Sequence, residues 1–193
     1  MPPKAKFTKE EIVSAALNII RQYGSTALTA RALASELGSS ARPVFTVFHT
    51  MEDVQREVAS AARELYDKYV QRGLSESPAF KGVGTQYIRF SINEPKLFQL
   101  LFMSEQPLIP DLSSVLPIID ENYHKILKSI EEGYKLDNKS AQKLYHHLWI
   151  YTHGIAALCA TKMCRFTGDE INGMLSEVCS SILIKLREGE SND

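Results

Sequence analysis

Hydrophobic residues recur three and four positions apart along most of the chain, which is the spacing of one face of an α-helix. In the first such segment the repeating residues are Ile12, Ala15, Ala16, Ile19 and Ile20. Alternation with a period of two, the pattern of a half-buried strand, is scarce. The pattern therefore predicts an all-α protein.

Capping residues and helix breakers divide this pattern into elements. Thr8 with Glu11, and Thr167 with Glu170, have the spacing of capping boxes, in which each side chain bonds the backbone N–H of the other. The first predicted helices begin at the caps Thr8, Thr29, Ser40 and Thr50 and end at Gly24, Gly38, Phe48 and about Gln71. The others cover residues 79–93, 95–103, 112–132, 139–164 and 168–187.

Two prolines fall inside predicted helices. Pro43 lies in the first turn of the third helix, where a missing backbone N–H costs little. Pro117 is expected near the start of the 112–132 segment or at a kink in it.

Residues 29–48 have the spacing of a helix-turn-helix, in which a tight glycine turn joins two short helices. Ala34 is small where the helices would cross, Gly38 tolerates the positive φ of the turn, and Val44 is placed to pack back on the first pair. The second helix of such a motif presents its N-terminal residues to base edges in the major groove. This segment is therefore predicted to bind double-stranded DNA.

The side chains in this segment suit the two kinds of DNA contact. Arg42 has the fork geometry that pairs with guanine. Thr29 and Arg31, at the start of the preceding helix, suit phosphate. The candidate base-contacting residues are Ser40, Ala41, Arg42 and Thr46.

The charge of the whole chain argues against DNA binding, but the charge of its N-terminal part does not. The 193 residues include 22 Lys and Arg and 23 Asp and Glu, for a net charge of −1, which does not suggest a DNA-binding protein. Residues 1–50, however, carry six basic and three acidic side chains, and residues 51–193 carry the other 16 basic and 20 acidic ones. A positive segment of +3 therefore precedes a body of −4.

Composition excludes several other classes of protein. Hydrophobic residues make up 44% and charged residues 23%, which is typical of a globular protein and not of a disordered one. No signal-peptide core follows the N-terminus, and no apolar run reaches the length of about 18 residues that a membrane span needs. Three cysteines do not make a disulfide framework. A cytoplasmic protein without a membrane partner is expected.

Two sets of motifs stand out in the sequence. The first set covers residues 8–54: Gly24-x4-Thr29, Leu33-Ala34-x3-Gly38-Ser39-Ser40 and Phe45-x2-Phe48-x2-Met51-Glu52-Asp53-Val54. The second consists of Asn93-Glu94-Pro95-Lys96-Leu97-Phe98-x2-Leu101-Phe102 and Trp149-x3-His153-Gly154. The first set resembles the DNA-binding domain of the TetR/AcrR-type transcriptional regulators, and the second resembles the C-terminal domain named for its Trp-His-Gly residues.

The resemblance implies a three-helix DNA-binding domain over residues 1–50 and a helical effector-binding and dimerisation domain over residues 51–193. It implies a homodimer that binds a palindromic operator, of the repressor type, and that a small-molecule effector releases. It adds Ser39, Phe45 and His49 to the candidate DNA contacts. Phe45 and Met51 depart from the family's usual Tyr and Lys, which would weaken the grip on the DNA backbone.

In the family the last two helices of each subunit pair across the dimer, and apolar stripes suited to this occur here. An intramolecular core would need the same stripes. The stripes are Leu144, Leu148, Tyr151, Ile155 and Leu158, and Ile171, Leu175, Val178, Ile182 and Leu186.

Aromatic residues are abundant between the fourth predicted helix and residue 164, where they could line a pocket for an apolar or aromatic effector. The same residues would also suit a hydrophobic core. The five favoured as lining, because they cluster around the two C-terminal motifs, are Phe98, Phe102, Tyr123, Trp149 and His153.

Metal and enzyme functions form the alternative interpretation. Glu121 and His124 match the Glu-x-x-His of di-iron bundles, but no second copy occurs. Three cysteines and two histidines could sense metal, although they lack compact zinc spacing: Cys159, Cys164, Cys179, His146 and His153. No catalytic residue, metal or cofactor is therefore expected. The alternative is a helical ligand- or metal-binding protein, or a small bundle enzyme, with a vestigial helix-turn-helix.

Overall fold

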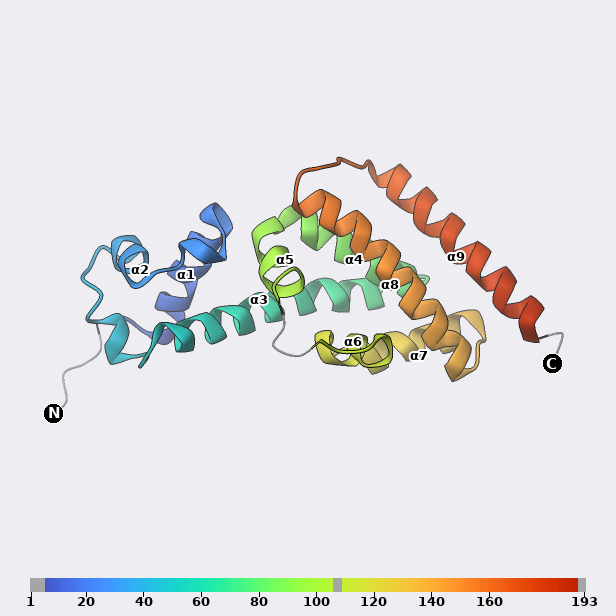
Figure 1. The fold of residues 1–193 in the computed structure, drawn as a ribbon, viewed down its shortest axis with the longest axis horizontal. Helices are drawn as coiled ribbons and strands as arrows, with labels where there is room; N and C mark the ends of the chain where they lie inside the picture. Colours follow the sequence, from blue (N-terminus) through green and yellow to red (C-terminus); the bar gives the residue numbers. More distant parts are fainter. Residues whose placement is uncertain (1–5, 106–108, 191–193) are drawn as a thin grey trace. The chain divides into compact units, whose positions relative to one another are not determined.

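A computed structural model describes residues 6–105 and 109–190, and within them it contains helices and no strand, which confirms the predicted all-α class (Figure 1). Two short 3-10 helices accompany the α-helices: η1 (Ser25–Ala27) and η2 (Val44–Thr46). The α-helices are α1 (Lys9–Tyr23), α2 (Ala30–Glu36), α3 (Met51–Leu74), α4 (Ala79–Asn93), α5 (Pro95–Phe102), α6 (Leu112–Ile119), α7 (Tyr123–Tyr134), α8 (Asn138–Ala160) and α9 (Gly168–Glu190).

Side-chain caps fix the helix starts as predicted. Thr8 Oγ1 accepts from the Glu11 backbone N–H at 3.2 Å, and Glu11 Oε2 accepts from the Thr8 N–H at 2.8 Å. Thr167 and Glu170 make the same reciprocal pair at 3.2 and 2.7 Å. Each box satisfies backbone donors that the first turn of a helix leaves without a partner.

The predicted third helix is wrong. Instead of an α-helix over residues 40–48, the chain forms turns followed by the single 3-10 turn η2. Pro43 explains the difference, because its ring disfavours helical backbone at Arg42 and it has no N–H to bond an earlier carbonyl. Ser40 therefore caps no helix. The helix-turn-helix spacing is kept, but its second element is irregular.

The predicted segment 112–132 is also wrong as a single helix, because α6 and α7 are separated at residues 120–122. The Asp120 carboxylate accepts from the Asn122 backbone N–H at 2.8 Å, a local turn that competes with helix continuation. Pro117 lies inside α6, one turn before this break. Two other helix ends differ from the predicted ones: α3 continues to Leu74, and α8 stops at Ala160, four residues before the predicted end.

The chain forms two compact units. Unit 1 consists of Met1–Leu65 and Glu94–Ser104, and unit 2 consists of Tyr66–Asn93 and Glu105–Asp193. The continuous helix α3 crosses from one into the other. These two compact units do not meet at the domain boundary that the sequence predicts after residue 50. The predicted functional boundary therefore stays a prediction.

In unit 1, α1 packs against α2 and α5 around an apolar core. Ile12, Leu33 and Val44 are fully buried there. Gly24 (φ 89°) ends α1 and Gly38 (φ 57°) makes the turn after α2, as predicted for backbone that only glycine adopts without strain. Val44 thus ties η2 to the core of unit 1.

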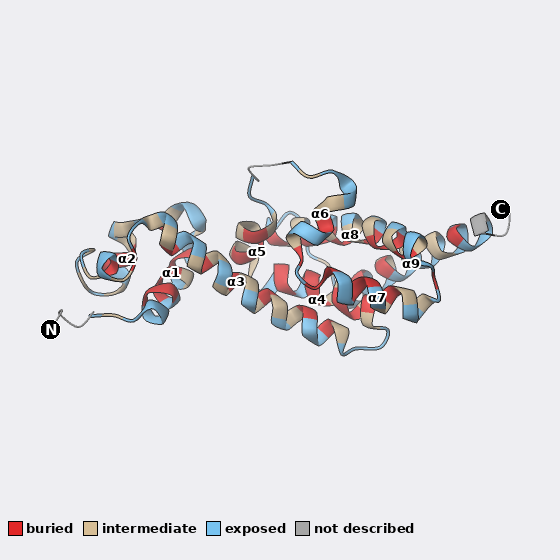
Figure 2. Cartoon of the chain, turned by 90° about the horizontal axis from the view of Figure 1, so that it is seen from below, coloured by how far each residue is buried: buried red, intermediate tan, exposed pale blue. Residues whose placement is uncertain are grey.

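Unit 2 is built around α4, which packs mainly on α8 and also on α7. Each helix buries one side, so buried and exposed positions alternate around it (Figure 2). The end of α3 meets the start of α4 through two glycines: a Cβ on Gly73 would lie 2.6 Å from the backbone of Val83, and one on Gly82 would overlap the Gly73 carbonyl. This approach needs glycine at both positions.

Candidate DNA interface and effector cavity

The predicted DNA contacts all lie in unit 1, at the start of α2 and along the turn around η2. The exposed ones are Thr29, Arg31, Ser40, Arg42, Phe45, Thr46 and His49, and the half-buried ones are Ser39 and Ala41. Two buried residues, Val44 within η2 and Phe48 just after it, anchor the turn to the core. The fold therefore presents the predicted set on the surface of unit 1.

Local hydrogen bonds shape this surface. Thr29 Oγ1 accepts from the Ala32 backbone N–H at 3.2 Å and caps α2, while the Thr46 hydroxyl donates to the Pro43 carbonyl at 2.6 Å. Both threonines thus have a structural role as well as the predicted one. The exposed side chain of Arg42 makes no hydrogen bond or ion pair with the rest of the described chain.

Lys6 adds a positive charge that motif spacing did not identify. Its Nζ donates to Ser39 Oγ at 3.0 Å, which brings the N-terminal arm beside the turn. The only signal in the sequence was the excess of basic residues in the first 50 positions. Lys6, Arg31 and Arg42 therefore supply positive charge to this end of unit 1.

A carboxylate also lies near this surface. Asp53, in the first turn of α3, accepts from the backbone N–H groups of His49 and Thr50 at 3.2 and 2.9 Å. The Thr50 backbone bond is the main reason that the pKa of Asp53 is lowered, so its negative charge persists in mild acid. The cap orders the end of the turn, and the ion pair between Asp53 and Arg56 offsets the negative charge that it brings near this surface.

Two of the five predicted effector-lining residues, Phe98 and Phe102, belong to α5 in unit 1. Their rings lie 5.2 Å apart, and Phe98 is completely buried. Phe98 therefore has the position of a core residue of unit 1, the second of the two interpretations that the sequence allowed, whereas Phe102 is half-buried.

The other three lie in unit 2, where they take part in aromatic pairs. Tyr123 stacks on Tyr145 with ring centroids 5.7 Å apart, and Trp149 lies 5.5 Å from His153. His153 Nδ1 lies 2.9 Å from the hydroxyl of Tyr87, and burial lowers the pKa of His153. A neutral imidazole bonded to a tyrosine is a satisfied packing group.

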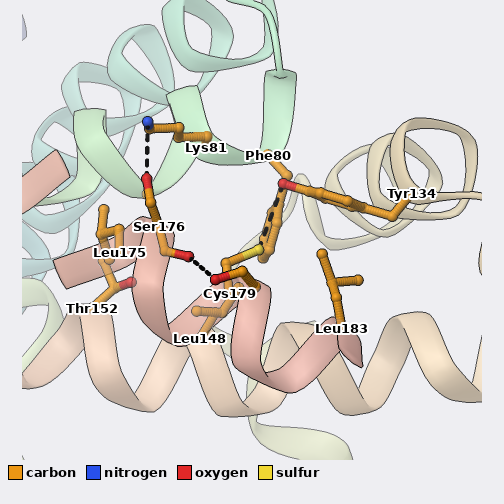
Figure 3. A pocket seen from close by; sticks show the side chains of 11 residues that line it. Phe80, Lys81, Tyr134, Leu148, Thr152, Leu175, Ser176, Cys179 and Leu183 are labelled. Atoms are coloured by element: carbon orange, nitrogen blue, oxygen red, sulfur yellow. Dashed lines mark hydrogen bonds between the residues drawn. The ribbon is translucent and has the colours of Figure 1, made fainter. Parts of the chain in front are cut away.

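Unit 2 contains two adjoining cavities. The larger, of about 240 Å³, lies between α4, α7, α8 and α9, and the smaller measures about 40 Å³. The larger is lined by Phe80, Lys81, Gly84, Tyr134, Leu148, Thr152, Leu175, Ser176, Cys179, Ser180 and Leu183 (Figure 3). The smaller is lined by Tyr66, Phe80, Val83, Gly84, Tyr87, Asp120, Tyr145, Trp149 and Thr152. Of the five predicted lining residues, Trp149 is found here.

The smaller cavity is surrounded by hydroxyl groups. Tyr66 donates to Asp120 Oδ2 at 2.9 Å, and burial, followed by the charge of Asp120, raises the pKa of Tyr66, Tyr87 and Tyr145 well above the usual value. These tyrosines stay protonated and can donate hydrogen bonds. The wall is therefore polar as well as aromatic.

The larger cavity is mostly apolar, with a few polar groups along α9. Lys81 Nζ donates to Ser176 Oγ at 3.2 Å, and the Cys179 thiol donates to the Tyr134 hydroxyl over 3.8 Å. Burial raises the pKa of Cys179, so the sulfur is held as a thiol. An apolar chamber with a few convergent polar groups is the usual form of a ligand site.

Sequence reasoning missed most of this lining for a physical reason. Phe80, Tyr134 and Leu175 come from three helices, and no spacing along the chain brings them together. Gly84 gave no signal either, although it faces both cavities. Only the packing of α4 on α8 and α9 creates the space.

Two other classes of site were tested against the structure. Among residues 6–105 and 109–190, no three His, Cys, Asp or Glu side chains are grouped as metal ligands. Within the same residues, no helix is both long and apolar enough to cross a membrane.

This chain is similar to known proteins in its three-dimensional structure and not detectably in its sequence. No protein-family model matches the sequence, and no curated protein matches it. Solved structures do match over nearly the full length of both chains. A single-residue variant of TetR from Acinetobacter baumannii, solved in complex with minocycline, has a TM-score of 0.59 and 14% identity, with 95% of this chain and 98% of that chain covered.

Two further structures extend the match. A transcriptional regulator from Rhodococcus sp. Rha1 has a TM-score of 0.62 and 17% identity, over 93% of this chain and 97% of its own. A protein from Mesorhizobium loti assigned to the TetR family of transcriptional regulators has a TM-score of 0.55 and 15% identity, over 91% and 95%. The chain therefore has the fold of the TetR-type transcriptional regulators.

Proposed function

We propose that this protein is a ligand-responsive, DNA-binding transcriptional regulator that works as a homodimeric repressor in the cytoplasm. Its operator is a palindrome of double-stranded DNA, and a small-molecule effector releases it. No catalytic step belongs to this function.

One observation carries the proposal: the basic and polar residues predicted to bind DNA come together on the surface of unit 1. Arg31 and Arg42 are exposed, and neither forms an ion pair with a carboxylate in the described chain. Phosphate contacts require exposed positive charge, and base readout requires a side chain such as Arg42 that can make two parallel hydrogen bonds to guanine.

The dimer is supported by apolar side chains that the subunit leaves exposed on its last two helices. Ile150 on α8 is 51% exposed and Ile184 on α9 is 60% exposed. Ile171 and Leu175, from the stripes considered in the sequence, are buried inside the subunit instead. Two copies pairing through α8 and α9 would cover the exposed residues. They would also supply two DNA-binding turns for a palindrome, with half-sites about 34–36 Å apart.

The effector is proposed to bind in the larger cavity of unit 2. The minocycline complex of the Acinetobacter baumannii TetR variant, a protein of the same fold, supports a ligand-binding role for such a body. Because α3 continues from unit 2 into unit 1, a ligand that prefers one arrangement of unit 2 can shift the DNA-binding equilibrium.

DNA binding is tested by measuring affinity across a salt series, using the DNA upstream of the protein's own coding sequence. The logarithm of the binding constant is expected to fall linearly with the logarithm of salt concentration. Arg42→Ala is expected to weaken binding by about 10- to 100-fold. Arg165→Ala, which removes the same charge from an exposed loop of unit 2, is the matched control and should bind as the parent does.

Binding without a salt slope would contradict the proposal and favour a ligand-binding protein with a vestigial helix-turn-helix. Equal losses in the Arg42 and Arg165 variants would mean that net charge alone matters, and that the turn does not read DNA.

A further inference from the structure

The larger cavity of unit 2 is mostly apolar, and Lys81 is the one charged side chain among the described residues that line it (Figure 3). This lysine is in the first turn of α4 and is only partly exposed. Its ammonium reaches across to α9, where it donates to Ser176 Oγ at 3.2 Å. A cation is therefore held at the rim of a chamber that otherwise suits hydrocarbon.

Among the described residues, no carboxylate neutralises this cation. Within residues 6–105 and 109–190 Lys81 forms no ion pair, and the hydroxyl of Ser176 that accepts its hydrogen bond is neutral. Burial raises the pKa of the Cys179 thiol, and the hydrogen bond with Tyr134 and then the charge of Lys81 offset part of that rise. A partly desolvated ammonium without a counter-ion favours an anion beside it.

The adjoining smaller cavity has the opposite electrostatic character. The smaller cavity shares Phe80, Gly84 and Thr152 with the larger one and is lined by the buried carboxyl group of Asp120. Asp120 accepts hydrogen bonds from the Tyr66 hydroxyl and the Asn122 backbone N–H. An anionic group would be repelled there, so its favourable place is the edge with Lys81.

The apolar part limits the size of a ligand. The space of about 240 Å³ lies between the side chains of Phe80, Leu148, Leu175 and Leu183. An apolar cavity of about 150 Å³ holds benzene, so this one fits a body on the order of ten non-hydrogen atoms.

We propose that the larger cavity binds a small organic anion, namely a carboxylate with an aromatic or aliphatic body of about ten non-hydrogen atoms. The carboxylate accepts hydrogen bonds from Lys81 Nζ and the Ser176 hydroxyl, and the body fills the space between Phe80, Leu148 and Leu175. This inference rests on the proposed function and names the chemical class of its effector.

Calorimetry with three probes of one shape tests the charge preference. The probes are 3-phenylpropionate, its carboxamide 3-phenylpropanamide and the amine 3-phenylpropylamine, each titrated into the full chain. We expect the carboxylate to bind about ten-fold more tightly than the amide, because its negative charge is attracted to the Lys81 ammonium, whereas the amide carbonyl can only accept a hydrogen bond. The amine should bind most weakly. Equal affinity for the carboxylate and the amide, preference for the amine, or no binding of any probe at millimolar concentration would overturn the inference.

Two variants locate the site. Lys81→Met should remove the ten-fold preference and leave the amide affinity unchanged, while Lys143→Met removes an exposed lysine on α8 outside the lining and should keep the preference. Gly84→Leu should abolish binding of all probes, because a Cβ there already lies 3.8 Å from Leu175 and Thr152 and a larger side chain would enter the cavity. Circular dichroism checks that each variant is folded. A preference that survives Lys81→Met in a folded protein overturns the assignment to Lys81.

DNA binding measured in parallel, without any probe, separates this inference from the proposed function. If the protein binds DNA and the amide releases it from DNA as well as the carboxylate does, the proposed function stands and the carboxylate class of effector is wrong. If the protein binds the carboxylate through Lys81 but has no affinity for DNA, the anion site stands and the proposed function is wrong.

Discussion

The two units of this protein place their candidate functional residues in opposite ways. In unit 1 the candidate DNA contacts fall within 21 consecutive positions, residues 29–49, and most are exposed. In unit 2 the cavity lining extends from Phe80 to Leu183, over four helices, and encloses a space that is mostly apolar. The candidate surface for a large partner is thus made by one local segment, and the candidate chamber for a small ligand is made by distant ones.

This difference determines which amino-acid substitutions each unit tolerates. The turn of unit 1 depends on a few local bonds, so surface substitutions there should change DNA binding and leave stability almost unchanged. The cavity of unit 2 depends on how closely helices pack, so small changes in volume should alter stability, binding or both. The following variants test this contrast, from the largest expected effect to the smallest.

Two glycines on α4 should give opposite results. Gly82→Ala is expected to lower the free energy of unfolding by about 1–3 kcal/mol, because its Cβ would overlap the Gly73 carbonyl and force α3 and α4 apart. Gly84→Ala should raise it by about 0.5–1 kcal/mol, since its Cβ meets only ordinary contacts within a helix. Urea denaturation measures both. Equal effects of the two substitutions would mean that the close approach does not determine the packing of unit 2.

The buried hydroxyl of Tyr66 should contribute through its bond to Asp120. Tyr66→Phe is expected to lower the free energy of unfolding by about 1–2 kcal/mol, because a buried carboxylate loses a donor. Tyr69→Phe is the control, since the Tyr69 hydroxyl accepts only a 3.3 Å bond from the exposed Asn93, and its effect should be within about 0.5 kcal/mol. Losses of the same size in both variants would argue against a special role for the Asp120 contact.

In unit 1, Pro43→Ala should change DNA binding more than it changes stability. The substitution restores a backbone N–H and allows Arg42 to become helical, so residues 40–48 can form the helix that Pro43 prevents. We expect operator affinity to rise about three-fold, on the order of 0.6 kcal/mol. Fluorescence anisotropy with labelled operator measures it. An unchanged or weaker affinity would show that the irregular turn is the form that binds DNA.

The smallest effect is expected for the ion pair between Arg21 and Glu94, which joins α1 to the start of α5 inside unit 1. Arg21 Nε and Nη2 donate to Glu94 at 2.9 and 3.1 Å. Both side chains are partly exposed, so the coupling in a double-mutant cycle should be only about 0.5 kcal/mol and should decrease in high salt. A coupling several times larger, or one insensitive to salt, would mean that unit 1 depends on long-range contacts as unit 2 does.

The same contrast explains how much could be predicted from the sequence. The caps at Thr8 and Thr167 and the turns at Gly24 and Gly38 involve neighbouring residues, so their patterns predicted the helix ends correctly. The helix over residues 40–48 failed because the missing N–H of Pro43 and its restriction of Arg42 outweighed the helical spacing. These are local effects, and the residue types alone do not show which of them prevails.

The cavity could not be predicted in the same way. Trp149, which belongs to a recognisable motif, lines only the smaller cavity, and its role in effector binding stays a prediction. Lys81 and Ser176, which line the larger cavity, lie 95 positions apart and meet only when α4 packs beside α9. Phe98 was favoured as lining by its motif but is buried in unit 1. An aromatic residue at helical spacing suits a core and a pocket equally well, and only packing decides between them.

The central claim is that the turn of unit 1 reads DNA, and a selection of bound sequences from a random pool of double-stranded DNA tests it most directly. At low salt the wild-type protein is expected to enrich a palindrome with two equal half-sites. Arg42→Ala should lose preference at one guanine of each half-site. Absence of any enriched sequence at low salt, or an enriched sequence whose preferences are the same in the Arg42→Ala protein, would contradict the claim.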